Sequence, residues 1–336
     1  MSHFIHLADI TRRFTSVPPL AERLAKRLTG SIASPTVVHA VEGVSLSVNR
    51  GETLGLVGES GCGKSTLGRV AAGILGPTLG HAAVGGEPVM VGKRKVTTRI
   101  QMVFQDPYAS LNPRMRVGET IAEGPLAHGL ITRAQAESDV TRWLTAVGLD
   151  AAAAQRFPHQ FSGGQRQRIA IARALAMRPD ALVCDEPVAS LDVSIQAQII
   201  NLFLQLRRDL NLTMLFISHD LSVVRHVSDR VAIMYLGRIV ETGPTEQIFK
   251  APRHPYTRAL LDSAPRLAAD GAPEQDIRPI QGELPSPITP PSGCAFHQRC
   301  AFAQARCKNE LPILRLLGEQ QQTACHFPLE TPNHAT

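Results

Sequence analysis

The sequence predicts an α/β fold around a largely parallel β-sheet, with an antiparallel β subdomain, an inserted helical subdomain and a small irregular C-terminal appendage. Short apolar strands alternate with helical segments over about the first 250 residues, and such alternation is typical of parallel strands joined by crossover helices. Residues 115–178 are mostly helical in pattern and too long for one crossover, which indicates the inserted subdomain. Beyond residue 250 proline is frequent and regular periodicity ends, which indicates the appendage.

The N-terminal part is expected to begin with two strands, at residues 3–9 and 39–48, separated by a basic loop insertion at about 16–37. An apolar strand at 52–57 runs into a glycine-rich turn and then a helix. That helix is predicted to place four apolar side chains on one face: Leu67, Val70, Ala71 and Ile74. Residues 78–100 are predicted to form short antiparallel strands.

The helical block is expected to break at Gly124-Pro125 and at Pro158, because proline disfavours the helix interior. The segments after it are predicted to be strands at 181–184, 213–217 and 231–235, with a helix at 194–210. The division is therefore a domain at 1–250, which contains the helical subdomain at about 112–178, and an appendage at 251–336.

Composition excludes several classes of protein. The 336 residues are 43% hydrophobic and 19% charged, which is enough apolar surface for an ordinary core. No run approaches the roughly 18 apolar residues of a membrane span, and the N-terminus lacks a secretory signal. The net charge of +6 is modest and dispersed, so no nucleic-acid partner is expected. Membrane contact is therefore expected only through a partner, from the cytoplasmic face.

A phosphate-binding loop is predicted between the strand at 52–57 and the following helix, since the sequence there fits G-x-x-x-x-G-K-[ST]. Backbone N–H groups of such a loop point at phosphate oxygens, and the helix N-terminus adds a positive end. Lys64 would reach the β- and γ-phosphates, and Ser65 would offer its hydroxyl to Mg²⁺. The predicted loop residues are Gly58, Glu59, Ser60, Gly61, Cys62, Gly63, Lys64, Ser65 and the supporting Thr66.

Two acids end the buried strand at 181–184 and complete this prediction. Asp185 and Glu186 would stand at the carboxyl end of a parallel strand, where ligands of α/β sheets bind. Asp185 is predicted to hold Mg²⁺, and Glu186 to polarise the attacking water.

Phe161-Ser-Gly-Gly-Gln165, followed by a basic and then apolar helix, resembles the signature motif of ABC ATPases. A P-loop NTPase of the ABC type is thus the expected fold, with ATP and Mg²⁺ as ligands. The resemblance implies that ATP is held between the phosphate loop of one subunit and the signature of another. The signature residues are Ser162, Gly163, Gly164 and Gln165.

Further residues match elements of the same family in the right order. Gln105 resembles the Q-loop glutamine that contacts metal and water, Asp192 lies in a D-loop, and His219 resembles the switch histidine at the γ-phosphate. Phe14 is the candidate for stacking on adenine. The resemblance assigns catalysis to Glu186, His219, Gln105 and Lys64, and Mg²⁺ binding to Ser65, Gln105 and Asp185.

The C-terminal part is similar to that of oligopeptide and dipeptide importers, in residues 253–260 and 282–294. It is most similar to the F-type ATPase subunit of such importers. This implies a heterodimer with a sister ATPase, two transmembrane permease subunits and, indirectly, an extracytoplasmic solute-binding protein.

Four cysteines crowd into the appendage with the spacing C-x5-C-x6-C-x17-C: Cys294, Cys300, Cys307 and Cys325. Reduced surroundings favour a metal site over disulfides. The family resemblance implies a [4Fe-4S] cluster ahead of Zn²⁺, and the alternative is that these residues are small apolar side chains. Two alternatives for function also stay open: a soluble ABC ATPase acting on nucleic acid or ribosomes, and an importer of a solute such as a nickel chelate.

Overall fold

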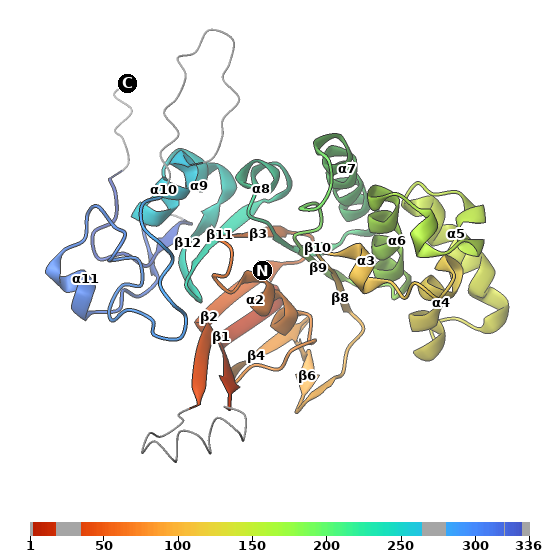
Figure 1. Ribbon diagram of the computed structural model, residues 1–336, viewed down its shortest axis with the longest axis horizontal. Helices are drawn as coiled ribbons and strands as arrows, with labels where there is room; N and C mark the ends of the chain where they lie inside the picture. Colours follow the sequence, from red (N-terminus) through yellow and green to blue (C-terminus); the bar gives the residue numbers. More distant parts are fainter. Residues whose placement is uncertain (1–2, 18–34, 264–279, 319, 331–336) are drawn as a thin grey trace, which may run out of the picture.

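The computed structural model describes residues 3–17, 35–263, 280–318 and 320–330. Most of the insertion predicted at 16–37 therefore lies outside the described residues. The molecule is elongated, with the helical subdomain at one end and the C-terminal appendage at the other (Figure 1). The mixed α/β architecture predicted from the sequence is confirmed.

The centre is an eight-stranded sheet with the order β13-β14-β12-β11-β3-β10-β9-β8. Neighbouring strands run parallel from β11 to β8 and antiparallel from β11 to β13. Every residue of β3, β9 and β10 is buried, as expected for parallel strands covered on both faces. The parallel strands are β3 (Thr53–Val57), β8 (Ile100–Val103), β9 (Ala181–Asp185), β10 (Thr213–Ile217) and β11 (Arg230–Tyr235).

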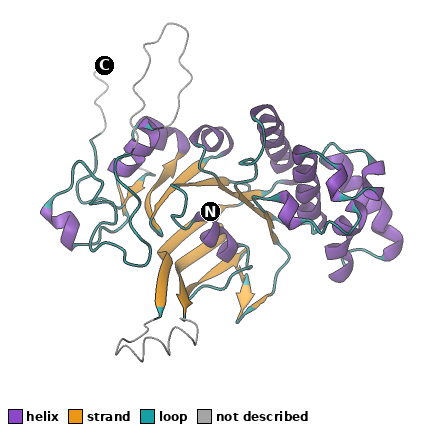
Figure 2. Cartoon of the chain, viewed as in Figure 1, coloured by secondary structure: helices purple, strands orange, loops and turns teal. Residues whose placement is uncertain are grey.

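The appendage joins this sheet, which the sequence did not predict. β12 (Arg238–Pro244) pairs with β11, and two short strands of the appendage, β14 (Gln322–Thr323) and β13 (Arg315–Leu316), extend the sheet from β12. The rest of the described appendage is mostly loop, with two helices, α10 (Pro255–Asp262) and the short α11 (Ala305–Asn309) (Figure 2). The boundary predicted at residue 250 thus marks a change in amino-acid composition, while the main sheet contains strands from both sides of it.

A second, antiparallel sheet forms the N-terminal subdomain below the central one in Figure 1. Its first two strands are longer than the predicted 3–9 and 39–48, and they pair along most of their length. Its order is β2-β1-β4-β5, and a separate hairpin follows it. The strands are β1 (His3–Ser16), β2 (Thr36–Asn49), β4 (Leu79–Val84), β5 (Glu87–Pro88), β6 (Met90–Val91) and β7 (Arg94–Lys95).

Helix α2 (Lys64–Ala71) lies between the two sheets and packs on both. Leu67, Val70 and Ala71 are buried as predicted. Placing Ile74 on the same face was wrong, because the helix ends at Ala71 and Ile74 is 48% exposed in the following turn. The opposite face of the central sheet is covered by α8 (Leu221–Val227), α9 (Thr245–Lys250) and α10 (Pro255–Asp262) (Figure 1).

The helical subdomain packs around a core that contains Trp143 and Leu144. The predicted break at Gly124-Pro125 was wrong, because α4 continues to Ala127 with Pro125 buried inside it. Proline removes one backbone bond there, and packing outweighs that loss near the helix end. The elements are α3 (Pro107–Ser110), α4 (Val117–Ala127), η1 (Arg133–Gln135), α5 (Ala136–Ala146), η2 (Ala151–Gln155), η3 (Pro158–Gln160), α6 (Gly163–Ala176) and, joining it to the sheet, α7 (Val193–Leu210).

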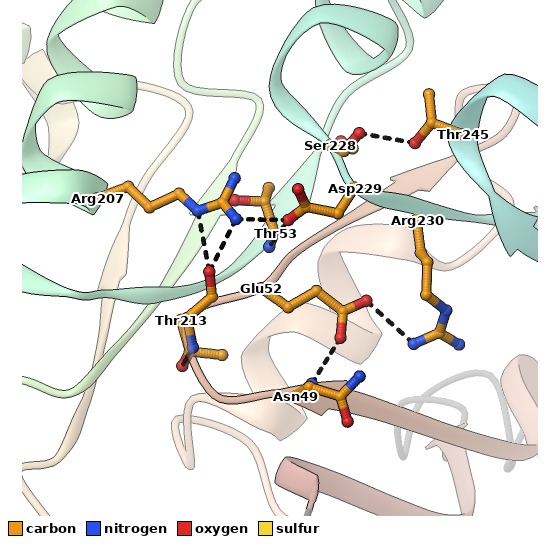
Figure 3. Close-up of polar contacts among 10 residues, drawn as sticks. Asn49, Glu52, Thr53, Arg207, Thr213, Ser228, Asp229, Arg230 and Thr245 are labelled. Carbon is orange, nitrogen blue, oxygen red and sulfur yellow. Dashed lines mark hydrogen bonds and ion pairs between the residues drawn. The ribbon is translucent and has the colours of Figure 1, made fainter. Parts of the chain in front are cut away.

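A polar network fastens the amino ends of the central strands (Figure 3). Arg207 of α7 donates to the Gly51 carbonyl at 3.0 and 2.8 Å and to Asp229 at 2.6 Å. Asp229 also accepts the backbone N–H of Thr53 at 2.8 Å. Because these contacts join α7, β3 and the start of β11, they hold the strand ends opposite the candidate site in register.

The appendage is anchored through a buried acid of β12. The Glu241 carboxylate accepts the backbone N–H groups of Arg253 at 2.6 Å and His254 at 3.0 Å, and the side-chain amide of Gln321 at 2.7 Å. His254 in turn caps α10, since its Nδ1 accepts the N–H of Tyr256 at 3.0 Å. Burial lowers the pKa of His254 to about 3.

Because His254 is buried in its neutral form, we expect the stability of the fold to decrease in acid. The pKa of His254 lies below its ordinary value, so the unfolded chain takes up the proton first as the pH falls. Stability contributed by neutral His254 is complete above about pH 6.5 and is lost progressively toward pH 3. Within that range the loss from this residue approaches about 1.4 kcal/mol per pH unit.

His254→Asn supplies a side-chain oxygen that can cap α10 in place of Nδ1, and it removes the titration. Denaturant unfolding at pH 7, 6 and 5 is expected to show a flatter pH dependence for this variant than for the unmodified chain. His128→Asn, at an exposed histidine, serves as the control and should leave the slope unchanged. Parallel curves for His254→Asn and the unmodified chain would contradict the assignment.

Candidate functional site

The predicted catalytic residues meet at one edge of the central sheet. Strands β3, β10, β9 and β8 are consecutive neighbours and parallel. Their carboxyl ends therefore lie side by side, and each leads into a predicted site segment. Lys64 follows β3, His219 follows β10, Gln105 follows β8, and Asp185 ends β9 with Glu186 directly after it.

The predicted phosphate loop, residues 58–65, connects β3 to α2. Lys64 is only 4% exposed, and its Nζ donates to the carbonyl oxygens of Gly58 at 2.8 Å and Glu59 at 3.0 Å. Gly63 has a φ of 107°, and a Cβ there would collide with the backbone carbonyl of Ala40. Glycine is therefore required at this turn, which supports the predicted tight wrapping of the loop.

Ser65 and Asp185 meet beneath the loop, although 120 residues separate them. The Ser65 hydroxyl donates to Asp185 Oδ1 at 2.8 Å, and Thr66 lies beside it, half-buried. Burial raises the pKa of Asp185, while the bond from Ser65 opposes that rise. A hydroxyl and a carboxylate are hard oxygen ligands, so this pair fits Mg²⁺.

Glu186 contacts the other two predicted catalytic side chains, those of Gln105 and His219. Its Oε2 accepts Gln105 Nε2 at 3.1 Å and lies 3.2 Å from His219 Nδ1. Glu186 has a φ of 45°, unusual for a residue with a side chain, and its N–H donates to the Ile217 carbonyl at 2.9 Å. Strained backbone of this kind occurs at functional sites. One carboxylate thus joins the ends of β8, β9 and β10.

The predicted signature residues form the amino end of α6. Ser162 Oγ accepts the N–H of Gln165 at 3.3 Å, and Gln165 Oε1 accepts the N–H of Ser162 at 3.0 Å. Both side chains are exposed. Within the described residues, no hydrogen bond or ion pair joins this capping box to the phosphate loop. Gly164 closely approaches Ile195 of α7, so the signature packs beside the predicted D-loop.

Two further predicted residues lie on exposed surface. Asp192 is the amino-terminal cap residue of α7, and the neighbouring Val193 is 82% exposed. Phe14 lies near the end of β1, is 38% exposed and carries the Arg12 guanidinium 4.7 Å from its ring centre. Its role toward adenine stays a prediction.

The four appendage cysteines come together around one small cavity. Cys294, Cys300, Cys307 and Cys325 line it, together with His297 and His326. Burial raises the pKa of Cys325 to about 11, and the other three thiols add to the rise. A set of soft thiol donors suits zinc or an iron–sulfur cluster. Within the described ranges, however, no three such side chains are arranged as a metal-ligand set.

Residues outside the predicted set also contact the phosphate loop. Tyr256 accepts the Glu59 N–H at 3.0 Å, and Arg299 forms an ion pair with the Glu59 carboxylate. Arg299 carried no sequence signal as a site residue, because 240 residues separate the partners. Tyr256 lies in the 253–260 segment that resembled peptide importers, which was its only sequence signal.

Comparison with known proteins identifies the family. The chain is 50% identical over 293 residues to the di/tripeptide transport ATP-binding protein DppF of Pseudomonas aeruginosa, covering 86% of this chain and 90% of that protein. It is 46% identical to the oligopeptide transport ATP-binding protein AppF of Bacillus subtilis, covering 96% and 97%. This chain belongs to the ATP-binding proteins of ABC transporters.

Family profiles and solved structures agree with this membership. An ABC transporter profile matches residues 41–189, and the profile of the oligopeptide/dipeptide transporter C-terminal region matches 240–307. Among solved structures, cbiO1 of Clostridium perfringens, part of the ABC transporter complex cbiONQ, gives a TM-score of 0.59 at 25% identity, covering 74% of this chain and 91% of that one. As an ABC ATPase, the chain binds and hydrolyses ATP. None of the helices in the described ranges has the length and hydrophobicity of a membrane span.

Proposed function

We propose that this chain is the ATP-hydrolysing subunit of an importer that takes up dipeptides or oligopeptides. The proposal rests on the similarity of this chain to proteins named for di/tripeptide and oligopeptide transport. That similarity extends through the C-terminal region as well as the ATPase core. A soluble ATPase acting on nucleic acid or ribosomes gains no support from these relatives. The subunit would work peripherally, at the cytoplasmic face of the membrane.

The proposed mechanism assigns each role from contacts at the strand ends. Lys64 is held by two neutral carbonyls, which γ-phosphate oxygens can replace with a stronger charge-assisted bond. Ser65 and Asp185 would hold Mg²⁺, which when bound neutralises phosphate charge. Glu186 would accept a proton from the attacking water.

Gln105 and His219 complete this arrangement from the neighbouring strand ends. Gln105 shares Glu186 Oε2 with His219, so it would help to position the same water. His219 is 59% exposed on its side chain, which leaves it free to turn toward the γ-phosphate. Phe14 would stack on adenine.

The exposed signature supports a head-to-tail pair of ATPase subunits. Ser162 and Gln165 are exposed and form no polar contact with the described phosphate loop of their own chain. An amino end of a 14-residue helix is a ready anion site, so it would complete the ATP site of a facing subunit. Exposed Val193 beside Asp192 suits burial in the same interface. We expect the facing subunit to be a sister ATPase.

A groove at the helical subdomain is the proposed contact for a permease helix. It has a volume of about 880 Å³ and lies between the β6–β7 hairpin, α4 and α6. Phe104 lines the groove and directly precedes Gln105, which contacts Glu186 at 3.1 Å. A permease segment seated there would therefore sense the catalytic centre through two adjacent residues.

The function is tested by reconstituting this chain with its sister ATPase, permeases and solute-binding protein in lipid vesicles. ATP hydrolysis should rise when the binding protein is loaded with a di- or oligopeptide, because substrate loading favours closure of the ATPase pair. Empty binding protein serves as the control. Stimulation by nickel chelates alone would contradict peptide import, and no stimulation by any solute would contradict the importer assignment.

Glu186→Gln tests the proposed base. The amide keeps the size of the side chain but cannot take the proton, so turnover should fall at least about 100-fold. ATP binding, measured by equilibrium titration, should persist. Glu246→Gln changes an exposed glutamate on α9 and should hydrolyse ATP normally. Turnover of Glu186→Gln close to that of the unmodified chain would contradict the role.

The cysteine cavity is proposed to hold a structural [4Fe-4S] cluster rather than zinc. Four thiols on one cavity support this, although their side chains would have to turn to form a ligand set. Anaerobically purified protein should contain iron and acid-labile sulfide and absorb visible light, and Cys300→Ser should lose all three. Cys184→Ser, in buried β9, should retain them. Metal-free, colourless protein would refute the proposal.

A further inference from the structure

The C-terminal appendage reaches back to the phosphate loop through one arginine. Arg299 Nη1 lies 2.7 Å from Glu59 Oε2, and its Nη2 lies 2.9 Å from Glu59 Oε1. The Arg299 side chain is 5% exposed and that of Glu59 is 25% exposed. Glu59 is the second residue of the predicted phosphate loop. A shielded, two-bonded pair of this kind is stronger than an ordinary surface ion pair.

The guanidinium has partners for each nitrogen. Arg299 Nε donates to the carbonyl of Gln281 at 3.1 Å, and Nη1 also approaches the Tyr235 hydroxyl at 3.4 Å. Gln281 belongs to the appendage and Tyr235 ends β11 of the central sheet. Arg299 thus has two partners besides Glu59, and they hold the guanidinium in place beside the loop.

A second contact holds the backbone of the same glutamate. The Glu59 N–H donates to the Tyr256 hydroxyl at 3.0 Å. Tyr256 is fully buried, with its ring 4.6 Å from that of Tyr235 and 5.3 Å from that of Phe296. Phe296 lies three residues before Arg299, so one short stretch of the appendage supports both contacts to Glu59.

These contacts bear on the lysine that faces phosphate. The Glu59 carbonyl accepts Lys64 Nζ at 3.0 Å, so the position of Glu59 affects that of Lys64. The Glu59 carboxylate is also a negative charge within the loop that must accept a triphosphate. Without a cation beside it, that charge would repel the nucleotide.

We propose that Arg299 is a positioning residue of the ATP site, which neutralises and orients Glu59 so that the phosphate loop binds ATP. The appendage is then part of the nucleotide site and not only a structural attachment. This inference rests on ATP binding at residues 58–65, and it does not depend on which solute is transported or on metal in the cysteine cavity.

The test compares ATP affinity and turnover in four variants of the full chain. Arg299→Ala should raise the Kd and KM for ATP about tenfold or more, with a smaller change in kcat, because it exposes an uncompensated charge. Arg299→Lys should recover part of the affinity. Adding Glu59→Gln to Arg299→Ala should restore affinity to that of Glu59→Gln alone, since the repelling charge is gone.

Arg225→Ala provides the matched control, because Arg225 and Glu246 form a similar two-bonded pair on exposed surface away from the loop. It should leave the KM for ATP unchanged. An unchanged KM in Arg299→Ala would overturn the proposal. So would equal impairment of Arg299→Ala and its Glu59→Gln double variant, since that would indicate general loss of structure. Failure of peptide stimulation in the reconstituted importer would leave these binding results unaffected.

Discussion

The register of the parallel strands is the constraint on which the site depends. Ile217 of β10 pairs with both Leu56 of β3 and Asp185 of β9. The phosphate loop, the acids and the segment leading to His219 therefore leave the sheet at the same level. A slip of one residue would turn every side chain of a strand to the opposite face of the sheet. The Arg207–Asp229 network at the far ends of these strands opposes such a slip.

Charge within the site is balanced by weak partners that a nucleotide can displace. Lys64 is held by carbonyls, and Asp185 by one hydroxyl. Burial removes water from the Asp185 carboxylate and so raises its pKa, which leaves the group in need of a cation partner. Glu59 differs, because its partner is a full positive charge from another part of the chain. In the phosphate loop, the contacts of Lys64 can thus be exchanged for phosphate oxygens, whereas the ion pair of Glu59 with Arg299 stays in place.

Local sequence patterns were enough to predict the features that depend on a few neighbouring residues. The phosphate loop and the acidic strand end needed only a few neighbouring residues, and the parallel sheet brought them together. The continuation of α4 through Pro125 and the entry of β14 into the main sheet depend on tertiary packing, which no local pattern contains. The Arg299–Glu59 pair was equally invisible, since proximity across 240 residues arises only from the complete fold.

The appendage illustrates why such contacts form. So short and irregular a segment buries too little apolar surface to support a core of its own. Phe296 instead enters a core shared with Val57 of β3 and Tyr235 of β11, and Tyr256 belongs to the same cluster. Val57 directly precedes the phosphate loop. Packing that stabilises the cysteine-bearing loop therefore also fixes the outer wall of the nucleotide site, so the two regions are expected to lose order together.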